Sequence, residues 1–318
     1  MCEIHLEYLK EEESVAHKIL FTGLDFAGKS SIIQVLKREF SKIAKIQPTK
    51  GANRRVFTLL DKEVSEWDLG GQETYRISYL KNPSKFFDDT EIAIYVIDIR
   101  NTERIDEALS YLKDVIEQFK KLKINPPINI FFHKCDPSLV RSSLDNLNNT
   151  ISELWERIQN FVKYKPVHYF HTSIYDTYSL MNAMSQILLE LYPKSQLLQK
   201  TIEEFAEKLN CEGLMIIDDN TLVLGAYYAN EEAKQFLTKS IGYFLTLNDN
   251  FLEIGLGEPE DQFLIHKLGK YFLFKQFNIK GRVQPYYALI LKSHNPFDLY
   301  FIKKEYSIFI NILNEIIS

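Results

Sequence analysis

A glycine-framed run of eight residues, placed directly after a short strand pattern, constrains this chain more than any other feature. Residues 18–22 have the β-branched and aromatic character of a strand, and residues 30–40 carry apolar side chains at helical spacing. Between them, Gly23-Leu24-Asp25-Phe26-Ala27-Gly28-Lys29-Ser30 fits the pattern G-x-x-x-x-G-K-[ST]. The N–H groups of such a loop point at phosphates, its lysine neutralises phosphate charge, and its serine hydroxyl ligates Mg²⁺. The residues predicted to contact a nucleotide here are Asp25, Phe26, Ala27, Gly28, Lys29, Ser30 and Ser31.

Strand and helix patterns alternate from this loop to residue 191. Extended segments are predicted at 18–22, 56–60, 64–69, 92–99, 128–133 and 168–172, and helices at 30–40, 106–122, 142–162 and 180–191. The second and third strands could form a hairpin through Asp61-Lys62. Such alternation implies right-handed crossovers and an α/β fold, with a mostly parallel six-stranded sheet and helices on both faces. Ligands bind these sheets beyond the carboxyl ends of the strands.

A second motif, Trp67-Asp68-Leu69-Gly70-Gly71-Gln72, ends the third predicted strand. Asp68 could hold Mg²⁺ through water, Gly71 could donate its N–H to a γ-phosphate, and Gln72 could orient an attacking water. A threonine between the two motifs is expected to reach back to Mg²⁺ and the γ-phosphate. Thr49 is the better candidate, because Thr58 lies within a strand-like run.

The third motif, His133-Lys134-Cys135-Asp136, follows a buried-type strand. The Asp136 carboxylate can accept hydrogen bonds from guanine N1–H and the exocyclic amino group, whereas adenine offers no such donor pair. Lys134 would pack its alkyl stem on the base. Ser173 and Ile174, after the last strand of this set, offer backbone N–H groups for guanine O6. Together the motifs predict a P-loop GTPase domain that binds GTP or GDP with Mg²⁺.

The pattern changes character after Tyr192-Pro193, where proline ends a helix. Beyond that point, helices are predicted at 195–209, 231–244 and 298–317, and strands at 213–217, 221–228, 251–255, 271–277 and 286–292. This order predicts an α+β domain with one sheet face covered by helices. The predicted boundaries are a polar leader at 1–14, a GTPase domain at 15–193 and a C-terminal domain at 194–318.

Composition excludes several classes of protein. The net charge of −5 supplies no basic field for nucleic acid. Three cysteines without paired spacing fit a reducing compartment and exclude a disulfide framework. Neither a membrane-spanning run nor a secretion signal, myristoylation or prenylation motif is found, so we expect a cytoplasmic protein that reaches a membrane only through a partner.

The sequence resembles a known family at these motifs. Gly-Leu-Asp-x-Ala-Gly-Lys and Trp-Asp-x-Gly-Gly-Gln are similar to those of Arf-like small GTPases. His133-Lys134-Cys135-Asp136 resembles the His-Lys-x-Asp of Rag GTPases, and Thr172-Ser173-Ile174-Tyr175-Asp176 resembles their Thr-Ser-Ile-Trp-Asp. The long C-terminal region also matches the Rag plan, in which a roadblock (longin-like) domain follows the GTPase domain.

The resemblance covers nearly the whole chain beyond residue 14 and implies roles for individual residues. It implies phosphate contact by Lys29, Mg²⁺ binding by Ser30, Thr49 and Asp68, water positioning by Gln72, and guanine recognition by Lys134 and Asp136. His133 stands where most small GTPases carry an asparagine that braces the phosphate loop. The family further implies a homo- or heterodimer formed through the C-terminal domains, with activating and exchange proteins as partners.

We expect slow intrinsic hydrolysis, near ~10⁻⁴ s⁻¹, because no arginine is placed to act on the phosphates in cis. Arg54 and Arg55 follow Thr49 but are interpreted as an exposed pair on a sheet edge. Two alternatives remain open: a GTP-binding scaffold without useful hydrolysis, and an Arf-type trafficking GTPase with an added tail.

Overall fold

The computed structural model describes ten segments of the chain: residues 16–36, 49–59, 62–162, 167–192, 194–218, 222–255, 262–267, 269–282, 284–293 and 297–317. They pack as two compact units. One comprises the described residues within 1–29, 47–131 and 153–169, and the other those within 30–46, 132–152 and 170–318.

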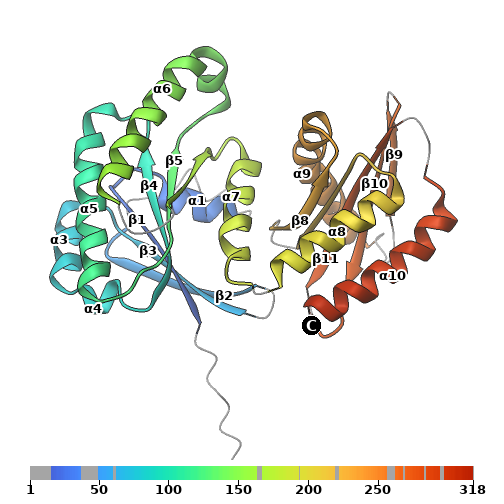
Figure 1. Ribbon diagram of the computed structural model, residues 1–318, viewed down its shortest axis with the longest axis horizontal. Coiled ribbons are helices and arrows are strands. Elements are labelled where there is room, and N and C mark those ends of the chain that lie inside the picture. The colour runs from blue at the N-terminus through green and yellow to red at the C-terminus, as the bar shows by residue number, and fades with distance from the viewer. Residues whose placement is uncertain are drawn as a thin grey trace, which may run out of the picture. The chain divides into compact units, whose positions relative to one another are not determined.

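The first sheet has six strands in the order β2-β3-β1-β4-β5-β6 (Figure 1). Its strands are β1 (His17–Gly23), β2 (Ala52–Leu59), β3 (Lys62–Leu69), β4 (Thr90–Asp98), β5 (Ile128–His133) and β6 (Val167–Thr172). Strand β1 runs parallel to β3 and β4, whereas β2 pairs antiparallel with β3 and forms an edge. Strands β1, β4 and β5 are buried at almost every position, as in a sheet covered on both faces. The predicted α/β fold class is therefore confirmed, and so is the hairpin pairing of β2 with β3.

Helices follow most of these strands. They are α1 (Lys29–Leu36), α3 (Glu73–Lys81), α4 (Pro83–Phe86), the 3₁₀ turn η1 (Thr102–Arg104), α5 (Ile105–Lys121), α6 (Pro137–Phe161) and α7 (Thr177–Leu189). Helix α6 begins at Pro137, five residues before the predicted start at 142, because proline suits the first position of a helix. Helix α3 was not predicted; only Arg76 and Tyr79 are buried in it, so it has no apolar stripe. Residues 37–40 of the predicted first helix lie outside the described residues.

The second sheet has the order β8-β7-β11-β10-β9. Its strands are β7 (Gly213–Asp218), β8 (Val223–Tyr228), β9 (Gln262–Lys267), β10 (Lys270–Asn278) and β11 (Pro285–Ser293), and its helices are α8 (Ser195–Leu209), α9 (Glu231–Glu253) and α10 (Leu299–Ile317). All of its strand pairs are antiparallel. The predicted strand at 251–255 is wrong, because α9 continues to Glu253 and the third strand of the group is β9. Phe251 instead packs from the helix onto Phe263 of β9, with ring centroids 5.6 Å apart.

Helices cover both faces of this second sheet, so the prediction of one covered face is also wrong. A Cβ on Gly213 would meet Leu237 of α9 at 2.6 Å, whereas a Cβ on Gly225 would meet Ile202 of α8 at 2.4 Å. Helix α10 joins α8 on its face, where Phe205 and Phe309 stack with centroids 4.0 Å apart. The buried apolar positions of both faces were visible in the sequence, but a period of two does not say which face a later helix will cover.

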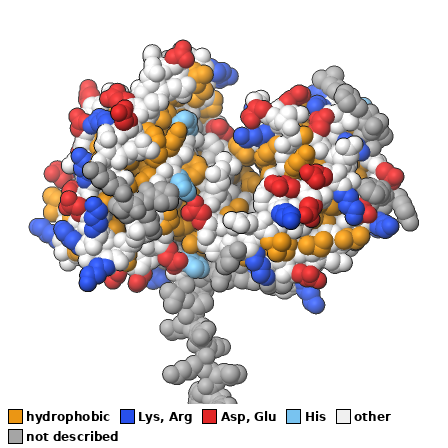
Figure 2. Space-filling model, in the orientation of Figure 1, with side chains coloured by type: hydrophobic (Ala, Val, Ile, Leu, Met, Phe, Trp, Pro, Cys, Tyr) orange, Lys and Arg blue, Asp and Glu red, His pale blue; other side chains and the backbone are white. Residues whose placement is uncertain are grey.

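Helix α7 also contacts the second sheet. Met181 belongs to the apolar cluster between α9 and the sheet, and the Ser185 hydroxyl accepts a hydrogen bond of 2.7 Å from the main-chain N–H of Val223 in β8. Among the described helices, none combines the length and apolar character that a bilayer span requires. Figure 2 shows acidic and basic side chains interspersed over the visible face rather than gathered by sign.

Candidate functional site

The glycine-rich loop leaves β1 through a position that only glycine can occupy. Gly23 has φ 136°, and a Cβ there would lie 2.4 Å from the carbonyl oxygen of Val96 in β4. Phe26 at the outer bend also has a positive φ, 59°, which is rare for a large side chain, and 70% of it is exposed. Main-chain geometry, rather than side-chain packing, therefore sets the course of the loop.

The Lys29 side chain lies inside the loop and bonds to its main chain. Its side chain is buried, and its Nζ donates hydrogen bonds to the carbonyl oxygens of Gly23 (3.1 Å) and Leu24 (2.8 Å). Burial lowers the pKa of Lys29 to about 8, although the carboxylates of Asp68 and Asp25 act in the opposite direction. A cation that is bound only to neutral carbonyls in a buried position is poised to accept an anion.

The predicted Mg²⁺ ligands carry oxygen atoms suited to that ion. The Thr49 hydroxyl donates to Asp68 Oδ2 at 3.1 Å, which places the two oxygens side by side. Ser30 follows Lys29 in the first turn of α1. Hydroxyl and carboxylate oxygens are the hard donors that Mg²⁺ binds in proteins, so this set fits the ion. Their role as ligands stays a prediction.

The segment that leads to Gln72 lies directly against the loop. A Cβ on Gly71 would lie 2.1 Å from the main-chain nitrogen of Asp25, so only glycine permits this approach. Gly70 is equally confined, and its N–H donates to the carbonyl oxygen of Gly51 at 2.9 Å. Gln72 occupies the N-cap of α3 without a side-chain capping bond, which leaves its amide group available for another task.

The predicted base-binding residues meet at the ends of β5 and β6. Asp136 is buried, and its Oδ1 accepts a hydrogen bond of 2.7 Å from the Ser173 hydroxyl. Ring nitrogen Nδ1 of His133 lies 2.9 Å from Thr172 Oγ1, so this histidine braces the end of β6. Lys134 has φ 66° and is partly buried, as is Ile174. The carboxylate is thus held in one orientation by a neighbouring hydroxyl.

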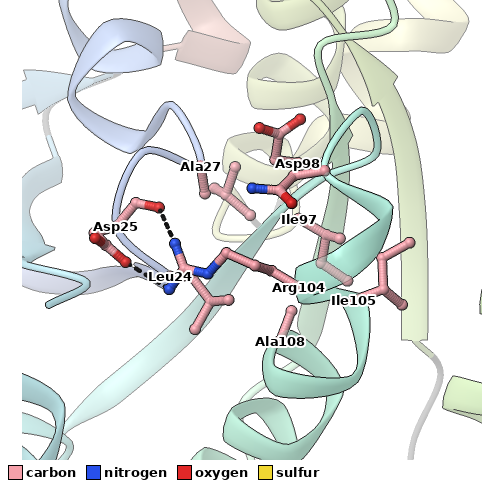
Figure 3. A pocket seen from close by; sticks show the side chains of 10 residues that line it. Leu24, Asp25, Ala27, Ile97, Asp98, Arg104, Ile105 and Ala108 are labelled. Atoms are coloured by element: carbon pink, nitrogen blue, oxygen red, sulfur yellow. Dashed lines mark hydrogen bonds and ion pairs between the residues drawn. The ribbon is translucent and has the colours of Figure 1, made fainter. Parts of the chain in front are cut away.

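An arginine beside the loop was missed by sequence reasoning. Arg104 Nη2 donates to Asp25 Oδ1 at 2.8 Å, and the pair lines a small pocket between the loop, the end of β4 and the start of α5 (Figure 3). The lining residues are Leu24, Asp25, Ala27, Val96, Ile97, Asp98, Asn101, Arg104, Ile105 and Ala108. No local pattern links Arg104 to the loop, because Asp25 lies 79 residues away in the sequence. Of the arginines predicted to form an exposed pair on the edge strand β2, Arg54 is exposed, whereas Arg55 is partly buried and paired with Glu66 at 2.7 Å.

Comparison with known proteins decides the family. The model of the Gtr1/RagA G protein conserved region matches residues 18–243, well over half of the chain. The chain belongs to the Gtr1/RagA family. Because the match continues to residue 243, it extends through β7 and β8 and into α9.

Arf-like proteins are also similar to this Gtr1/RagA family member. ADP-ribosylation factor F of Dictyostelium discoideum is 33% identical over 144 residues, which cover 43% of this chain and 72% of that protein. ADP-ribosylation factor-like protein alp41 of Schizosaccharomyces pombe is 30% identical over 185 residues, covering 58% and 89%. The solved structure of the Arl6 BBS3 small GTPase from Trypanosoma brucei, with a bound GppNp analogue, is 18% identical with a TM-score of 0.45, and covers 55% and 97%. The chain is a small GTPase of the Rag and Arf-like type.

Proposed function

We propose that this chain binds Mg²⁺·GTP, hydrolyses it slowly, and signals through partners that distinguish the bound nucleotide. The observation that carries the proposal is the buried Asp136 carboxylate, which Ser173 orients at the end of β5. A buried carboxylate needs donors, and guanine supplies two adjacent ones, N1–H and the exocyclic amino group, where adenine has an acceptor nitrogen and a C–H. Lys29, already desolvated, takes the β- and γ-phosphates.

The switching mechanism follows from the contact between the loop and Gly71. Mg²⁺, when bound, neutralises charge on the β- and γ-phosphate oxygens. Thr49 and Gly71 are drawn to the γ-phosphate, which orders their two segments until hydrolysis removes it. Gln72 orients the attacking water. We further propose that the protein works in the cytoplasm, that partners bring it to membranes, and that activating and exchange proteins set its two nucleotide states.

Nucleotide extraction tests the central proposal. Protein purified from cells and denatured should release GTP or GDP, in a ratio to protein close to one. Protein refolded without nucleotide should bind GTP and not ATP when each is offered with Mg²⁺. Recovery of adenine nucleotides, or equal binding of ATP, would show that Asp136 does not read a base.

Gln72→Leu separates a GTPase from a GTP-binding scaffold. Because the Gln72 side chain does not cap α3, its loss should leave the helix intact. We expect single-turnover hydrolysis, near ~10⁻⁴ s⁻¹ in the wild type, to fall on the order of tenfold or more. Glu73→Leu, one residue along the same helix, is the matched control and should hydrolyse GTP at the wild-type rate. An unchanged rate in Gln72→Leu would favour the scaffold.

We also propose that the C-terminal domain is of the roadblock type and pairs with a second copy through β9. This strand is an edge of the second sheet, and Leu264 and Ile265 expose 49% and 39% of their side chains on it. An unpaired edge bearing exposed apolar residues is a template for another strand. The opposite edge, β8, is occupied, because Gln199 of α8 exchanges hydrogen bonds with the main chain of Ala226.

Helix α9 extends this apolar edge. Its exposed residues Phe236, Tyr243 and Leu247, with Ile254 just past its end, follow helical spacing along one side. That side leans toward the edge, since Phe236 meets Phe272 of β10 with centroids 6.3 Å apart. Ile265 lies on the face of the sheet that α9 covers, because it pairs with Phe272, whereas Leu264 lies on the other face. A two-fold axis at this edge would bring the α9 helices of two copies toward one another.

The sequence of β9 favours self-pairing. In a two-fold antiparallel pair centred on Leu264, Leu264 stands opposite its own copy and Ile265 opposite Phe263, and Lys267 does not stand opposite a second lysine. Apolar side chains then lie opposite apolar side chains at the centre of the pair, and such cross-strand contacts stabilise a sheet. Charge and pattern are therefore compatible with two identical chains.

The mass of the protein in solution tests this pairing. We expect twice the chain mass of 37.3 kDa for the wild type and the single-chain mass for Leu264→Lys, which buries a charge in the interface. Leu197→Lys is the matched control, because that leucine is 53% exposed on α8. It should remain a dimer. A wild-type mass of one chain at micromolar concentration, or a dimer of Leu264→Lys, would contradict the proposal.

A further inference from the structure

One carboxylate in α5 binds two arginines from different elements. Glu107 accepts hydrogen bonds from Arg104 at the end of η1, through Nε at 2.9 Å and Nη2 at 3.2 Å. It also accepts one from Nη2 of Arg76 in α3. These bonds, first those from Arg104 and then that from Arg76, hold the pKa of Glu107 below its ordinary value. Glu107 therefore links α3 to the start of α5 as an anion.

The Arg76 end of this link is anchored to the helix that carries Gln72. The main-chain N–H of Arg76 donates to the carbonyl oxygen of Gln72 at 3.0 Å, in the first turn of α3. Its guanidinium is buried and lies 5.1 Å from the centroid of the Tyr111 ring in α5. The first turn of α3, and with it the backbone of Gln72, is thus fixed against α5.

The Arg104 end is anchored to the phosphate-binding loop. Arg104 donates to the Asp25 carboxylate at 2.8 Å, and Figure 3 shows its guanidinium directed at that residue. Asp25 is also the residue whose backbone touches Gly71, immediately before Gln72. The loop at Asp25 is consequently held from two sides, by the chain leading to Gln72 and by Arg104.

The link is balanced in charge and partly open to water. Two arginines face two carboxylates, and the side chains of Arg104 and Glu107 are 32% and 40% exposed. Exposed pairs of this kind add little to stability, because water screens them and ordering the side chains costs entropy. The Arg76 side chain, by contrast, is only 10% exposed, so the link joins one buried arginine and one partly exposed arginine through the same carboxylate, and it fixes the first turn of α3 relative to Asp25.

We propose that Glu107 is a positioning residue for GTP hydrolysis, which sets Gln72 against the phosphate-binding loop through Arg76 and Arg104. The inference rests on the proposed function. Glu107 itself touches no nucleotide in this account. Its loss lets the first turn of α3 shift relative to Asp25, so Gln72 spends less time aligned with the attacking water, whereas the contacts that bind GTP persist.

A double-mutant cycle tests the proposal. Single-turnover hydrolysis and GTP affinity are measured for the full chain as wild type, Glu107→Gln, Gln72→Leu and the double variant. We expect Glu107→Gln to slow hydrolysis about tenfold, because misplacement of a reacting group by even about 1 Å is costly. GTP affinity should stay within about threefold of wild type, and Glu107→Gln should have no further effect on hydrolysis once Gln72 is absent.

The matched control is Asp106→Asn. Asp106 precedes Glu107 on α5 and also pairs with an arginine, Arg157 of α6, but its side chain is 86% exposed. It should hydrolyse GTP at the wild-type rate. An unchanged rate in Glu107→Gln, an equal loss with and without Gln72, or a loss of GTP binding would each overturn the role of Glu107. If Gln72→Leu alone leaves the rate unchanged, the catalytic role proposed for Gln72 fails together with it.

Discussion

Replacing Lys29 with methionine is expected to weaken GTP binding on the order of 1000-fold. Lys29 offers the phosphates an ammonium group that has already lost its water and is held by two carbonyl oxygens. Hydrogen bonds to charged groups contribute about 1.5–3 kcal/mol each, and a phosphate oxygen left unpaired in this loop adds a desolvation cost. About 4 kcal/mol corresponds to a factor of 1000 in the dissociation constant. Titration with a fluorescent GTP analogue would measure it.

Lys18→Met is an unusually close control for this substitution. Lys18 is also buried, also has a pKa lowered to about 8 by burial, and also donates to two main-chain carbonyls, those of Phe86 and Asp88. It lies at the start of β1, however, whereas Lys29 follows the end of that strand. We expect Lys18→Met to retain wild-type affinity. Equal losses in the two variants would mean that Lys29 acts through the fold rather than on the phosphates.

The lowered pKa of Lys29 adds a pH dependence with a definite sign. Above about pH 8 the free protein loses the charge that binds phosphate, so GTP affinity should fall about tenfold between pH 7 and 9. The stability of the nucleotide-free protein, by contrast, should increase as the pH rises. Between about pH 8 and the ordinary lysine pKa of 10.5, the folded chain binds fewer protons at Lys29 than the unfolded chain, so this residue makes the free energy of unfolding rise with pH. Lys29→Met should abolish both trends.

Two elements, one buried along its whole length and one amphipathic, were predicted from the sequence to the residue. Strand β5 was predicted at its observed bounds because six consecutive residues are buried. Helix α8 was predicted at its observed bounds because its apolar residues recur at helical spacing. In both elements the residues that the sequence pattern marks as apolar are the ones that the fold buries, so the pattern alone is enough to predict where the element begins and ends.

Elements whose burial depends on distant parts of the chain were not recovered. Strand β9 was missed because five of its six residues are exposed, so alternation is weak, and Phe251 was interpreted as a strand residue although it is the end of α9. Helix α3 was missed because it has no apolar stripe, and one of its two buried residues, Arg76, pairs with Glu107, which lies 31 residues away in the sequence. Ion pairs between remote residues leave no periodic signal, and for the same reason Arg104 escaped notice.

The main-chain geometry of the phosphate-binding loop could be predicted from the sequence, whereas the roles of the site residues stay predictions. Loops that bind phosphate depend on main-chain geometry, and glycines at Gly23 and Gly71 record that geometry directly in the sequence. The partner of Asp136 was not predicted, since Ser173 had been assigned only a backbone role. The Ser173 hydroxyl affects how the side chain at position 136 is oriented when Asp136 is replaced with asparagine.

Asp136→Asn is expected to lower GTP affinity on the order of 100-fold and to create binding of xanthosine triphosphate. The amide removes the negative charge that both guanine donors require and turns an NH₂ group toward the exocyclic amino group. Xanthine carries an oxygen at that position, which the same NH₂ group can pair with. Ser173 favours this change in base preference. Its hydroxyl can still donate to Oδ1 of the asparagine, which leaves the Nδ2 amino group facing the base.

Competition between GTP and xanthosine triphosphate, measured on the wild type and the variant, gives the ratio of the two nucleotide affinities directly. Asp176→Asn is the control, because Asp176 caps α7 through Ser179 and asparagine caps helices equally well. It should keep the wild-type preference for GTP. The carboxylate at 136 is the group in this account that pairs with guanine N1–H and the exocyclic amino group, so a variant that still prefers GTP over xanthosine triphosphate would place the base elsewhere. In that case the phosphate loop alone would remain as the nucleotide contact, and selection of guanine would need a different residue.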